Sequence, residues 1–380
     1  MQRRHADLLS LDTHVDIPSA YMREPRFDVG TPTALRVDLG KMQRGGLNAA
    51  FFVIFVEQGP LTDAGYAAAV VAAERKYRGI ELMLTRHPER IRLATTAQQV
   101  RDLHANGLLA AMIGIENGYS LGHDLKRLDA AYTRGARYLG LVHVGNNDLC
   151  TSSLPNADLG EAAIAATGAT EFGRAAIERA NRLGMMVDIS HASDACVRDV
   201  LQLSRAPIIA SHSAARALVD HPRNLSDEWL KAIASKGGVI QVVAYKEFLK
   251  VDPARKSAEK QLESEVAQSV SATAFDSEAH NQLPLYIAGM QRIQSRFPLA
   301  TLSDYVEHIA YVARVAGIDH VGIASDFDGG GGVTGWMDAS ETGNVTQALR
   351  QRGFSEVDIA KIWGGNLLRV WDAVENVAEH

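Results

Sequence analysis

The chemistry that this sequence could perform is first indicated by a histidine and an aspartate at the end of an apolar segment. Residues 8–16 (Leu-Leu-Ser-Leu-Asp-Thr-His-Val-Asp) have the pattern of a short buried strand that ends in His14 and Asp16. Side chains two residues apart on a strand point to the same face, so this imidazole and this carboxylate converge. Such nitrogen and oxygen ligands suit Zn²⁺ or a similar divalent cation. An H-x-D triplet is common by chance, so the prediction needs matching ligands elsewhere.

Later apolar segments end in polar residues of the same kind. They are Glu116 after residues 108–115, His143 after 138–142, His191 after 185–189, His212 after 207–210 and Asp326 after 320–323. Helical patterns lie between most of these segments, for example over residues 64–85 and 302–316. The alternation predicts an α/β fold of the (β/α)8 TIM-barrel type, in which the carboxyl ends of all strands surround one axis.

One part of the chain departs from this regular alternation. Residues 246–300, between the seventh and eighth predicted strands, are rich in Glu, Gln, Ser and Ala. Their helical pattern predicts an insertion that caps the site or forms an oligomer contact. We therefore expect residues 1–380 to form a single barrel domain rather than two domains.

Convergence of these ligands predicts a centre for two cations. Histidines and carboxylates clustered at a barrel end would be costly to bury without bound cations. One ion can take His14 and Asp16, the other His191 and His212, and the two oxygens of Glu116 can bridge them. Two such ions would hold a bridging water as hydroxide and polarise a carbonyl group, which is hydrolytic chemistry.

Two further residues have roles in this hydrolytic scheme. Asp326 would remain free to act as general base and then as general acid toward a leaving amine. His143 could donate a hydrogen bond to the oxyanion. Asp328 lies two residues beyond Asp326 and competes for the acid and base role.

Composition limits the partners and the compartment. Of the 380 residues 46% are hydrophobic, and the net charge of −6 argues against binding of nucleic acid or an anionic membrane. Cys150 and Cys196 lack C-x-x-C spacing and are predicted to be free thiols.

No signal peptide or membrane span is recognisable, so a cytoplasmic location is expected, or a periplasmic or secreted one if a signal peptide was removed before this numbering. We expect a small-molecule partner and a homodimer.

Several motifs together resemble one known family. They are Leu-Asp-Thr-His-Val-Asp at 11–16, Gly-Ile-Glu-Asn at 114–117, Asp-Ile-Ser-His at 188–191, Ala-Ser-His-Ser at 210–213, Ser-Asp-Phe-Asp-Gly at 325–329, Arg-Gly-Gly at 44–46 and Gly-Gly-Asn-Leu-Leu-Arg-Val at 364–370. As an ordered set they are similar to the membrane dipeptidase (renal dipeptidase) family of zinc metallopeptidases, in its bacterial form. The mammalian form differs because this chain lacks a hydrophobic C-terminal tail.

The resemblance implies a (β/α)8 dipeptidase with two Zn²⁺ ions per chain. It assigns the ions to the ligands named above, and it favours Asp326 over Asp328 as the acid and base. It further implies that His143 and Arg223 hold a free dipeptide, with Arg223 on the terminal carboxylate. Tyr245 matches a position that faces the substrate. Members of the family tolerate a D-residue at the C-terminal position.

Two other functions remain open. An amidohydrolase-type enzyme acting on a cyclic amide would use the same metal chemistry, but such enzymes usually have H-x-H after the first strand and a carboxylated lysine as bridge. Here the first motif is H-x-D and the bridging candidate is Glu116. A barrel that binds a ligand without catalysis is the third possibility, and the intact set of ligands together with Asp326 argues against it.

Overall fold

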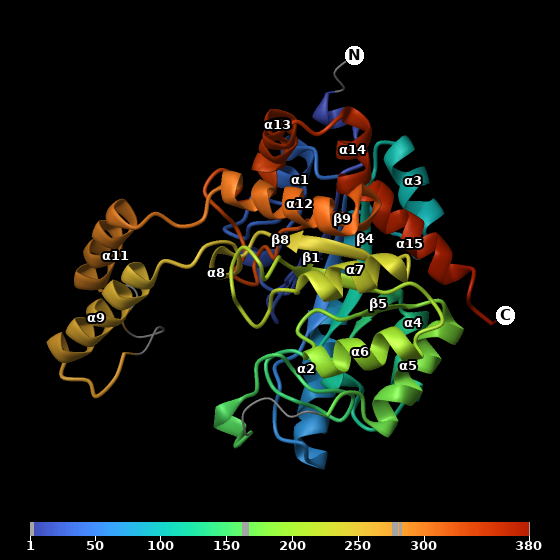
Figure 1. Ribbon diagram of the computed structural model, residues 1–380, viewed down its shortest axis with the longest axis horizontal. Helices are drawn as coiled ribbons and strands as arrows, with labels where there is room; N and C mark the ends of the chain where they lie inside the picture. Colours follow the sequence, from blue (N-terminus) through green and yellow to red (C-terminus); the bar gives the residue numbers. More distant parts are fainter. Residues whose placement is uncertain (1–3, 162–166, 276–279, 281–282, 380) are drawn as a thin grey trace.

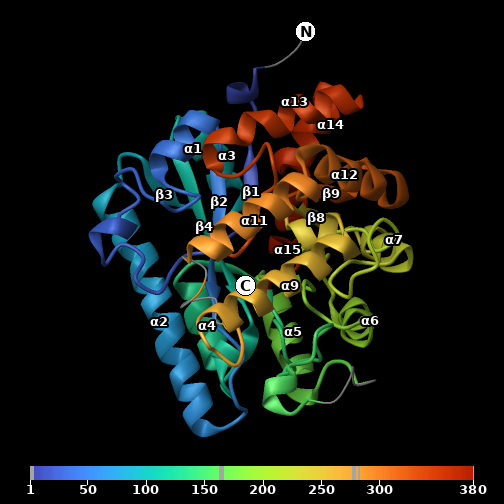
Figure 2. The same ribbon diagram turned by 90° about the vertical axis from the view of Figure 1, so that its left-hand side faces the viewer.

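Eight parallel strands surround one axis and form the centre of the molecule (Figures 1 and 2). The computed structural model describes residues 4–161, 167–275, 280 and 283–379. The hydrogen-bonded order is β1, β2, β4, β5, β6, β7, β8, β9, and β3 pairs with β4 outside this path. The bounds of these strands are β1 Leu11–Val15, β2 Ala49–Phe55, β3 Ile91–Leu93, β4 Leu109–Glu116, β5 Ala136–Gly140, β6 Met186–Asp188, β7 Ile209–Ser213, β8 Val239–Val243 and β9 Val321–Ala324.

The first and last strands close the barrel. The Asp326 amide donates to the His14 carbonyl at 3.0 Å, and the Asp16 amide donates to the Phe327 carbonyl at 2.9 Å. Asp12 adds a side-chain link, since its Oδ1 accepts from the amides of His14 and Ser325. The predicted (β/α)8 barrel is therefore confirmed, and its closure joins the first motif of the sequence to the last.

Helices cover the outside of the barrel and follow most strands. Their bounds are α1 Leu39–Gly45, α2 Asp63–Arg86, α3 Ala97–Ala105, α4 Lys126–Thr133, α5 Glu171–Leu183, α6 Asp194–Leu203, α7 Asp227–Ser235, α8 Lys246–Leu249, α9 Pro253–Ser269, α11 Pro284–Arg296, α12 Leu302–Ala316, α13 Thr342–Arg352, α14 Glu356–Ala360, the π-helical segment Lys361–Gly365 and α15 Asn366–Glu375. Side-chain caps begin many of them: Ser226 caps α7, and Ser355 with Asp358 forms a capping box on α14.

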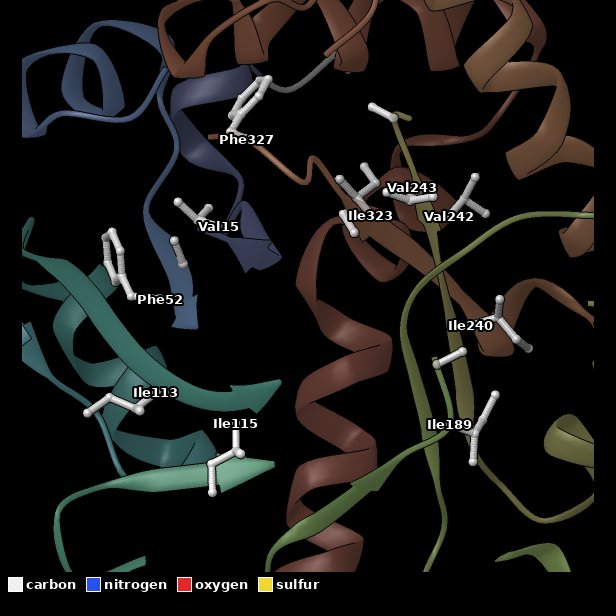
Figure 3. Close-up of a cluster of buried hydrophobic side chains, with 14 of the residues drawn as sticks. Val15, Phe52, Ile113, Ile115, Ile189, Ile240, Val242, Val243, Ile323 and Phe327 are labelled. Atoms are coloured by element: carbon white, nitrogen blue, oxygen red, sulfur yellow. The ribbon is translucent and has the colours of Figure 1, made fainter. Parts of the chain in front are cut away.

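The core has two layers because successive strand residues face opposite sides. Side chains on the outer faces of the strands pack under the helices, and Figure 3 shows part of this layer, including Val15, Phe52, Ile113, Ile240 and Ile323. The inner layer fills the lower barrel with residues such as Phe51 and Tyr138, and Trp371 of α15 stacks 5.7 Å from Phe51. Apolar packing ends above this layer, so the strands' carboxyl ends are left to polar residues.

The segment between β8 and β9 is a helical insertion, as predicted. Helices α9 and α11 form a hairpin that projects from the barrel (Figure 1). Leu262, Val266 and Ile293 form a small core of their own between the two helices, separate from the barrel core. None of the described helices is both long and apolar enough to cross a membrane.

Two expectations about the chain were wrong or incomplete. Cys150 and Cys196 are not free thiols, because they form a buried disulfide with Cα atoms 6.0 Å apart. The 46-residue separation hid this pairing, but the barrel brings the loop after β5 against the first turn of α6. The short strand β3 was missed, since three residues carry too little pattern to be recognised.

Candidate metal centre and substrate cavity

Glu116 is the centre of the polar cluster at the carboxyl end of the barrel. It is the last residue of β4, and its carboxylate is buried. One oxygen, Oε2, lies 3.1 Å from Nε2 of His14. The other, Oε1, lies 3.2 Å from Nε2 of His191 and 3.5 Å from Nε2 of His212. Oε2 of this carboxylate thus faces His14, whereas Oε1 faces His191 and His212, and the rings of His14 and His212 also lie close, with centroids 3.8 Å apart.

The group on the Oε2 side comes from the strands that close the barrel. His14 Nε2 lies 3.6 Å from Asp16 Oδ2 and 3.9 Å from Asp326 Oδ1. Gly329 makes this approach possible, because a Cβ there would lie 2.2 Å from Asp16 Oδ2 and 2.6 Å from Asp326 Oδ1. His14, Asp16 and Asp326 each offer an atom within 4.8 Å of the others, which is a spacing that one cation can bridge.

The group on the Oε1 side contains three histidines. Nε2 of His191 lies 2.9 Å from Nε2 of His212, and Nε2 of His143 lies 3.7 Å from Glu116 Oε1. The imidazole rings of His143 and His191 stack with centroids 4.1 Å apart. Nδ1 of His191 is buried without a hydrogen-bond partner among the described residues.

Ring orientation in two histidines is set by hydroxyl groups. The Tyr138 hydroxyl donates to the Thr13 carbonyl, so it can only accept from His14 Nδ1, which lies 3.2 Å away. The Ser211 hydroxyl donates to Asp188 Oδ2 at 2.6 Å and lies 2.8 Å from His212 Nδ1. With the proton on Nδ1 in each ring, the Nε2 lone pair faces the cluster, as a metal ligand requires.

Electrostatics of the cluster favour a bound cation. Burial lowers the pKa of His191 and His212 well below the usual imidazole range, and the positive charge of Arg223 adds to this, so both rings are neutral ligands. Burial also acts on His14, but the carboxylates of Glu116 and Asp16 outweigh it and raise its pKa well above the usual value. The negative charge of these carboxylates therefore favours a bound cation at this position.

Strained backbone marks the same region. His191 has φ of +70° and Asp326 has φ of +58°, a left-handed conformation that side chains with a Cβ rarely adopt. Asn117, directly after Glu116, has φ of +66° and is held by its own side chain, which donates to the Val56 carbonyl at 2.9 Å. Such strain persists where the surrounding structure enforces it, and it is concentrated at functional sites.

The cluster lies in a cavity of about 860 Å³, with different charges around its wall. Arg223 lines one side: its guanidinium is buried, donates from Nη2 to the His212 carbonyl at 3.2 Å, and has no partner for Nε among the described residues. Burial lowers the pKa of Arg223 to about 10, so it remains charged at neutral pH. Tyr245 lines the cavity beside Phe248, with ring centroids 4.5 Å apart.

Asp326 and Asp328 both line this cavity, but the fold also uses the carboxylate of Asp328. Burial raises the pKa of Asp326 well above the usual carboxyl range, and the negative charges of Asp16 and Glu116 act in the same direction. The carboxylate of Asp328 accepts from the amides of Arg36 and Val37 at 2.8 and 3.2 Å and so holds the loop before α1.

The structure thus brings together the residues that the sequence predicts. His14, Asp16, Glu116, His191, His212 and Asp326 meet at one point, and His143, Arg223 and Tyr245 line the cavity around it. Sequence reasoning missed Lys76 on α2, which also lines the cavity. The signal was available: with Ala69, Ala73, Ile80 and Met83, Lys76 falls on the buried stripe of an amphipathic helix.

Comparison with known proteins agrees with this geometry. A family model described as membrane dipeptidase (peptidase family M19) matches residues 1–380. The chain belongs to this family. The M19 family members are metallopeptidases, and this chain is accordingly a metal-dependent peptide hydrolase.

Known proteins match this M19 chain over almost its whole length. The probable dipeptidase PvdM from Pseudomonas aeruginosa has a structure similar to this one, with a TM-score of 0.86, 36% identity, and coverage of 98% of this chain and 97% of that one. The dipeptidase tcpJ of Claviceps purpurea (strain 20.1) is 29% identical over 360 residues, which is 93% of this chain and 73% of that protein. A metallopeptidase from Rhodobacter sphaeroides, solved with a phosphinate mimic of L-Ala-D-Ala, shares the fold with a TM-score of 0.74, 22% identity, and coverage of 97% and 99%.

Proposed function

We propose that this protein hydrolyses the peptide bond of free dipeptides at a centre of two Zn²⁺ ions. The observation that carries the proposal is the division of Glu116 between two groups of ligands. We assign His14 and Asp16 to one ion, His191 and His212 to the other, and Glu116 to both. Family membership supports dipeptide hydrolysis, and the geometry supports the two-ion arrangement.

The spacing of the donor atoms fits zinc. Zinc to nitrogen or oxygen bonds of about 2.0–2.1 Å place neighbouring ligands of a tetrahedral shell about 3.3–3.4 Å apart. The contacts of Glu116 with His14, His191 and His212 are 3.1, 3.2 and 3.5 Å. This donor set of imidazoles and carboxylates suits Zn²⁺ better than Ca²⁺ or Mg²⁺, which prefer oxygen ligands alone.

Side chains of this protein would carry out the proton transfer and stabilise the developing negative charge. Bound divalent cations supply Lewis acidity, which activates water near neutral pH and polarises the scissile carbonyl. Asp326, beside His14 and Asp16, would take a proton from the attacking water and deliver it to the leaving amine. His143 would donate a hydrogen bond to the oxygen that gains negative charge.

Arg223 and Tyr245 would select free dipeptides. The Arg223 guanidinium is buried and its Nε has no hydrogen-bond partner among the described residues, and a buried guanidinium binds a carboxylate strongly. A terminal carboxylate held there would fix the distance from the chain end to the scissile bond, so longer peptides would be excluded. Tyr245 would cover the C-terminal residue, and we extend the proposal to substrates with a D-residue at that position.

The decisive assay uses the zinc-loaded protein on matched dipeptides. The panel contains L-Ala-L-Ala, L-Ala-D-Ala, their C-amidated and N-acetylated forms, and a hydantoin, with metal content measured on the same sample. We expect cleavage of the free dipeptides, with about two ions per chain, and a loss of roughly 10- to 100-fold in kcat/KM on amidation, the value of a charge-assisted hydrogen bond. Cleavage of the hydantoin alone would instead indicate an amidohydrolase acting on cyclic amides.

Arg223→Lys provides the matched control for this assay. Lysine keeps the charge but loses the forked geometry that a carboxylate binds. We expect the variant to cleave free dipeptides poorly and to lose most of the difference between free and amidated substrates. An unchanged preference for the free carboxylate would remove Arg223 from the proposed role.

We also propose that the chain is a single domain that pairs as a homodimer through the α9 and α11 hairpin. Leu285 and Ile287 on α11 are 40% and 42% exposed, and the hairpin already has its own small core. Light scattering on the wild type and on Leu285→Asp tests the contact: a dimer that becomes a monomer supports it. A wild-type monomer contradicts it.

The buried disulfide suggests an oxidising compartment. Disulfides persist in the periplasm or outside the cell and are rare in a reducing cytoplasm. We therefore propose the periplasmic or secreted alternative rather than the cytoplasmic one. Counting free thiols in denatured protein, trapped with an alkylating agent at lysis, would give no reactive cysteine if this is correct and two if it is wrong.

A further inference from the structure

Lys76 is a charged residue on the inner face of α2, where every neighbour in the stripe is apolar. It is only 7% exposed and lines the wall of the substrate cavity. Its Nζ lies 4.0 Å from Asp16 Oδ1 and 5.1 Å from the centre of the Phe55 ring. Among the described residues this is its only ion pair, and Nζ donates no hydrogen bond. Burying an ammonium group with so little compensation is costly.

Asp16 does not satisfy this ammonium group. The other oxygen of Asp16, Oδ2, lies 3.6 Å from His14 Nε2, within the group of ligands assigned to a cation. A cation bound there would share the single negative charge of Asp16 and would itself repel Lys76. The remaining place for a counter-charge is the cavity, which Nζ faces.

Lys76 and Arg223 lie on opposite sides of the barrel mouth. Lys76 is on the helix that follows β2, the second barrel strand, and Arg223 is in the loop that follows β7, the sixth. In a closed barrel of eight strands the sixth strand is four positions from the second in either direction, so these positions are diametrically opposed. Glu116 and its ligands lie between them. The cavity therefore has a cation on each side of the reacting centre.

This arrangement determines what each end of a dipeptide meets. With the terminal carboxylate on Arg223 and the scissile carbonyl over Glu116, the first residue extends toward Phe55, Glu57 and Lys76. The exposed carboxylate of Glu57 is available to the α-ammonium group. The side chain of the first residue is then the part of the substrate that reaches Lys76.

We propose that Lys76 is a specificity-determining residue that binds a carboxylate on the side chain of the first residue, so that the preferred substrates are aspartyl and glutamyl dipeptides. The inference rests on the proposed dipeptidase function. It concerns the acyl side of the scissile bond, which Arg223 does not contact. Discrimination comes from one hydrogen-bonded ion pair formed with the buried ammonium group of Lys76.

The test compares L-Glu-L-Ala with L-Gln-L-Ala, which have the same shape and differ in one charge. The ratio of kcat/KM for the two substrates is measured within each protein, so a general loss of activity cancels. We expect the wild type to favour the glutamyl substrate roughly 10- to 100-fold, the range for a charge-assisted hydrogen bond. Lys76→Met should bring the ratio close to one, and Lys76→Arg should retain a preference for the acidic substrate.

Arg75→Met is the matched control, because Arg75 is the exposed neighbour of Lys76 on the same helix. It removes the same charge from α2 without changing the cavity, so the ratio should stay at the wild-type value. Metal content is measured for every variant. If Lys76→Met loses metal and both substrates slow equally, Lys76 acts only by positioning Asp16 and the inference is wrong.

The outcomes separate the two proposals. If the wild type cleaves both dipeptides at similar rates, the dipeptidase function stands and the role of Lys76 is overturned. If the zinc-loaded wild type cleaves no dipeptide, the proposed function fails and the specificity proposal fails with it.

Discussion

The hydroxyl group of Tyr138 lies 3.2 Å from Nδ1 of His14 and determines which nitrogen of that imidazole faces Glu116. The hydroxyl hydrogen is donated to the Thr13 carbonyl, so the hydroxyl oxygen accepts from the imidazole. Gly114 makes room for this contact, because a Cβ there would lie 2.0 Å from the Tyr138 ring. Tyr138 of β5 thus orients His14, a candidate ligand on β1, and this contact is possible because Gly114 of β4 has no side chain.

Tyr138→Phe should weaken cation binding without unfolding the protein. Loss of the hydroxyl frees the His14 ring to change tautomer, and losses of such supporting contacts typically cost about 10- to 100-fold in metal affinity. Affinity is measured by competition with a chromogenic chelator. Tyr77→Phe is the control, since the Tyr77 hydroxyl is buried on α2 without a partner among the described residues. Equal affinities in the two variants would contradict the orienting role.

Asp326→Asn should keep its metal and lose turnover. The amide cannot take a proton from water, and general acid and base groups typically contribute about 10²- to 10⁴-fold to the rate. Glu116→Ala should instead lose metal, because the Glu116 carboxylate lies within 3.1 Å of His14 and 3.2 Å of His191. Metal content and dipeptide cleavage are measured side by side.

Asp328→Asn distinguishes the two aspartates. Its two carboxylate oxygens accept from the amides of Arg36 and Val37, one each, and the asparagine oxygen keeps one of these two hydrogen bonds. We expect turnover within a few fold of the wild type. A loss as large as that of Asp326→Asn, with metal retained, would move the acid and base role to Asp328.

Replacing both Cys150 and Cys196 by Ser should destabilise the fold. A disulfide that closes a 46-residue separation typically contributes about 2–4 kcal/mol to the free energy of unfolding. Urea unfolding of wild type and double variant, each with and without dithiothreitol, checks this. Reductant should lower the stability of the wild type to that of the variant and leave the variant unchanged.

His308 should make stability depend on pH. Its Nδ1 accepts from the Ala215 amide at 3.2 Å, which requires a neutral ring, and burial lowers its pKa from 6.5 to about 4. Between these values the unfolded chain binds the proton and the folded one does not. Stability from this group is therefore complete above pH 6.5 and falls as the pH drops toward 4.

The measurement compares wild type with His308→Gln in urea unfolding at pH 7 and pH 5. One pKa unit corresponds to about 1.4 kcal/mol, so the wild type should lose about 2 kcal/mol more than the variant on this change. Both proteins share the other titrating groups, whose effects cancel in the difference. Parallel losses in both proteins would contradict the assignment to His308.

Much of the fold was predictable from local patterns. The helix expected over residues 302–316 has those bounds, and the helix expected over 64–85 spans Asp63–Arg86. The predicted end of a strand was wrong where the strand leads into polar residues. The strand β5 ends at Gly140, two residues before the predicted end, so His143 lies in a loop. Periodicity reports burial of a face, and it loses meaning where the strands open into a polar site.

The sequence by itself determined the order of strands and helices, the residue types at the strand ends and the family to which they belong. These follow from local spacing, because alternation and capping act over a few residues. Only the tertiary structure decided how close His14, His191 and His212 come to the Glu116 carboxylate, that Cys150 meets Cys196 and that Lys76 lines the same cavity as Arg223. These relationships join residues far apart in the chain, and closure of the barrel is what brings them together.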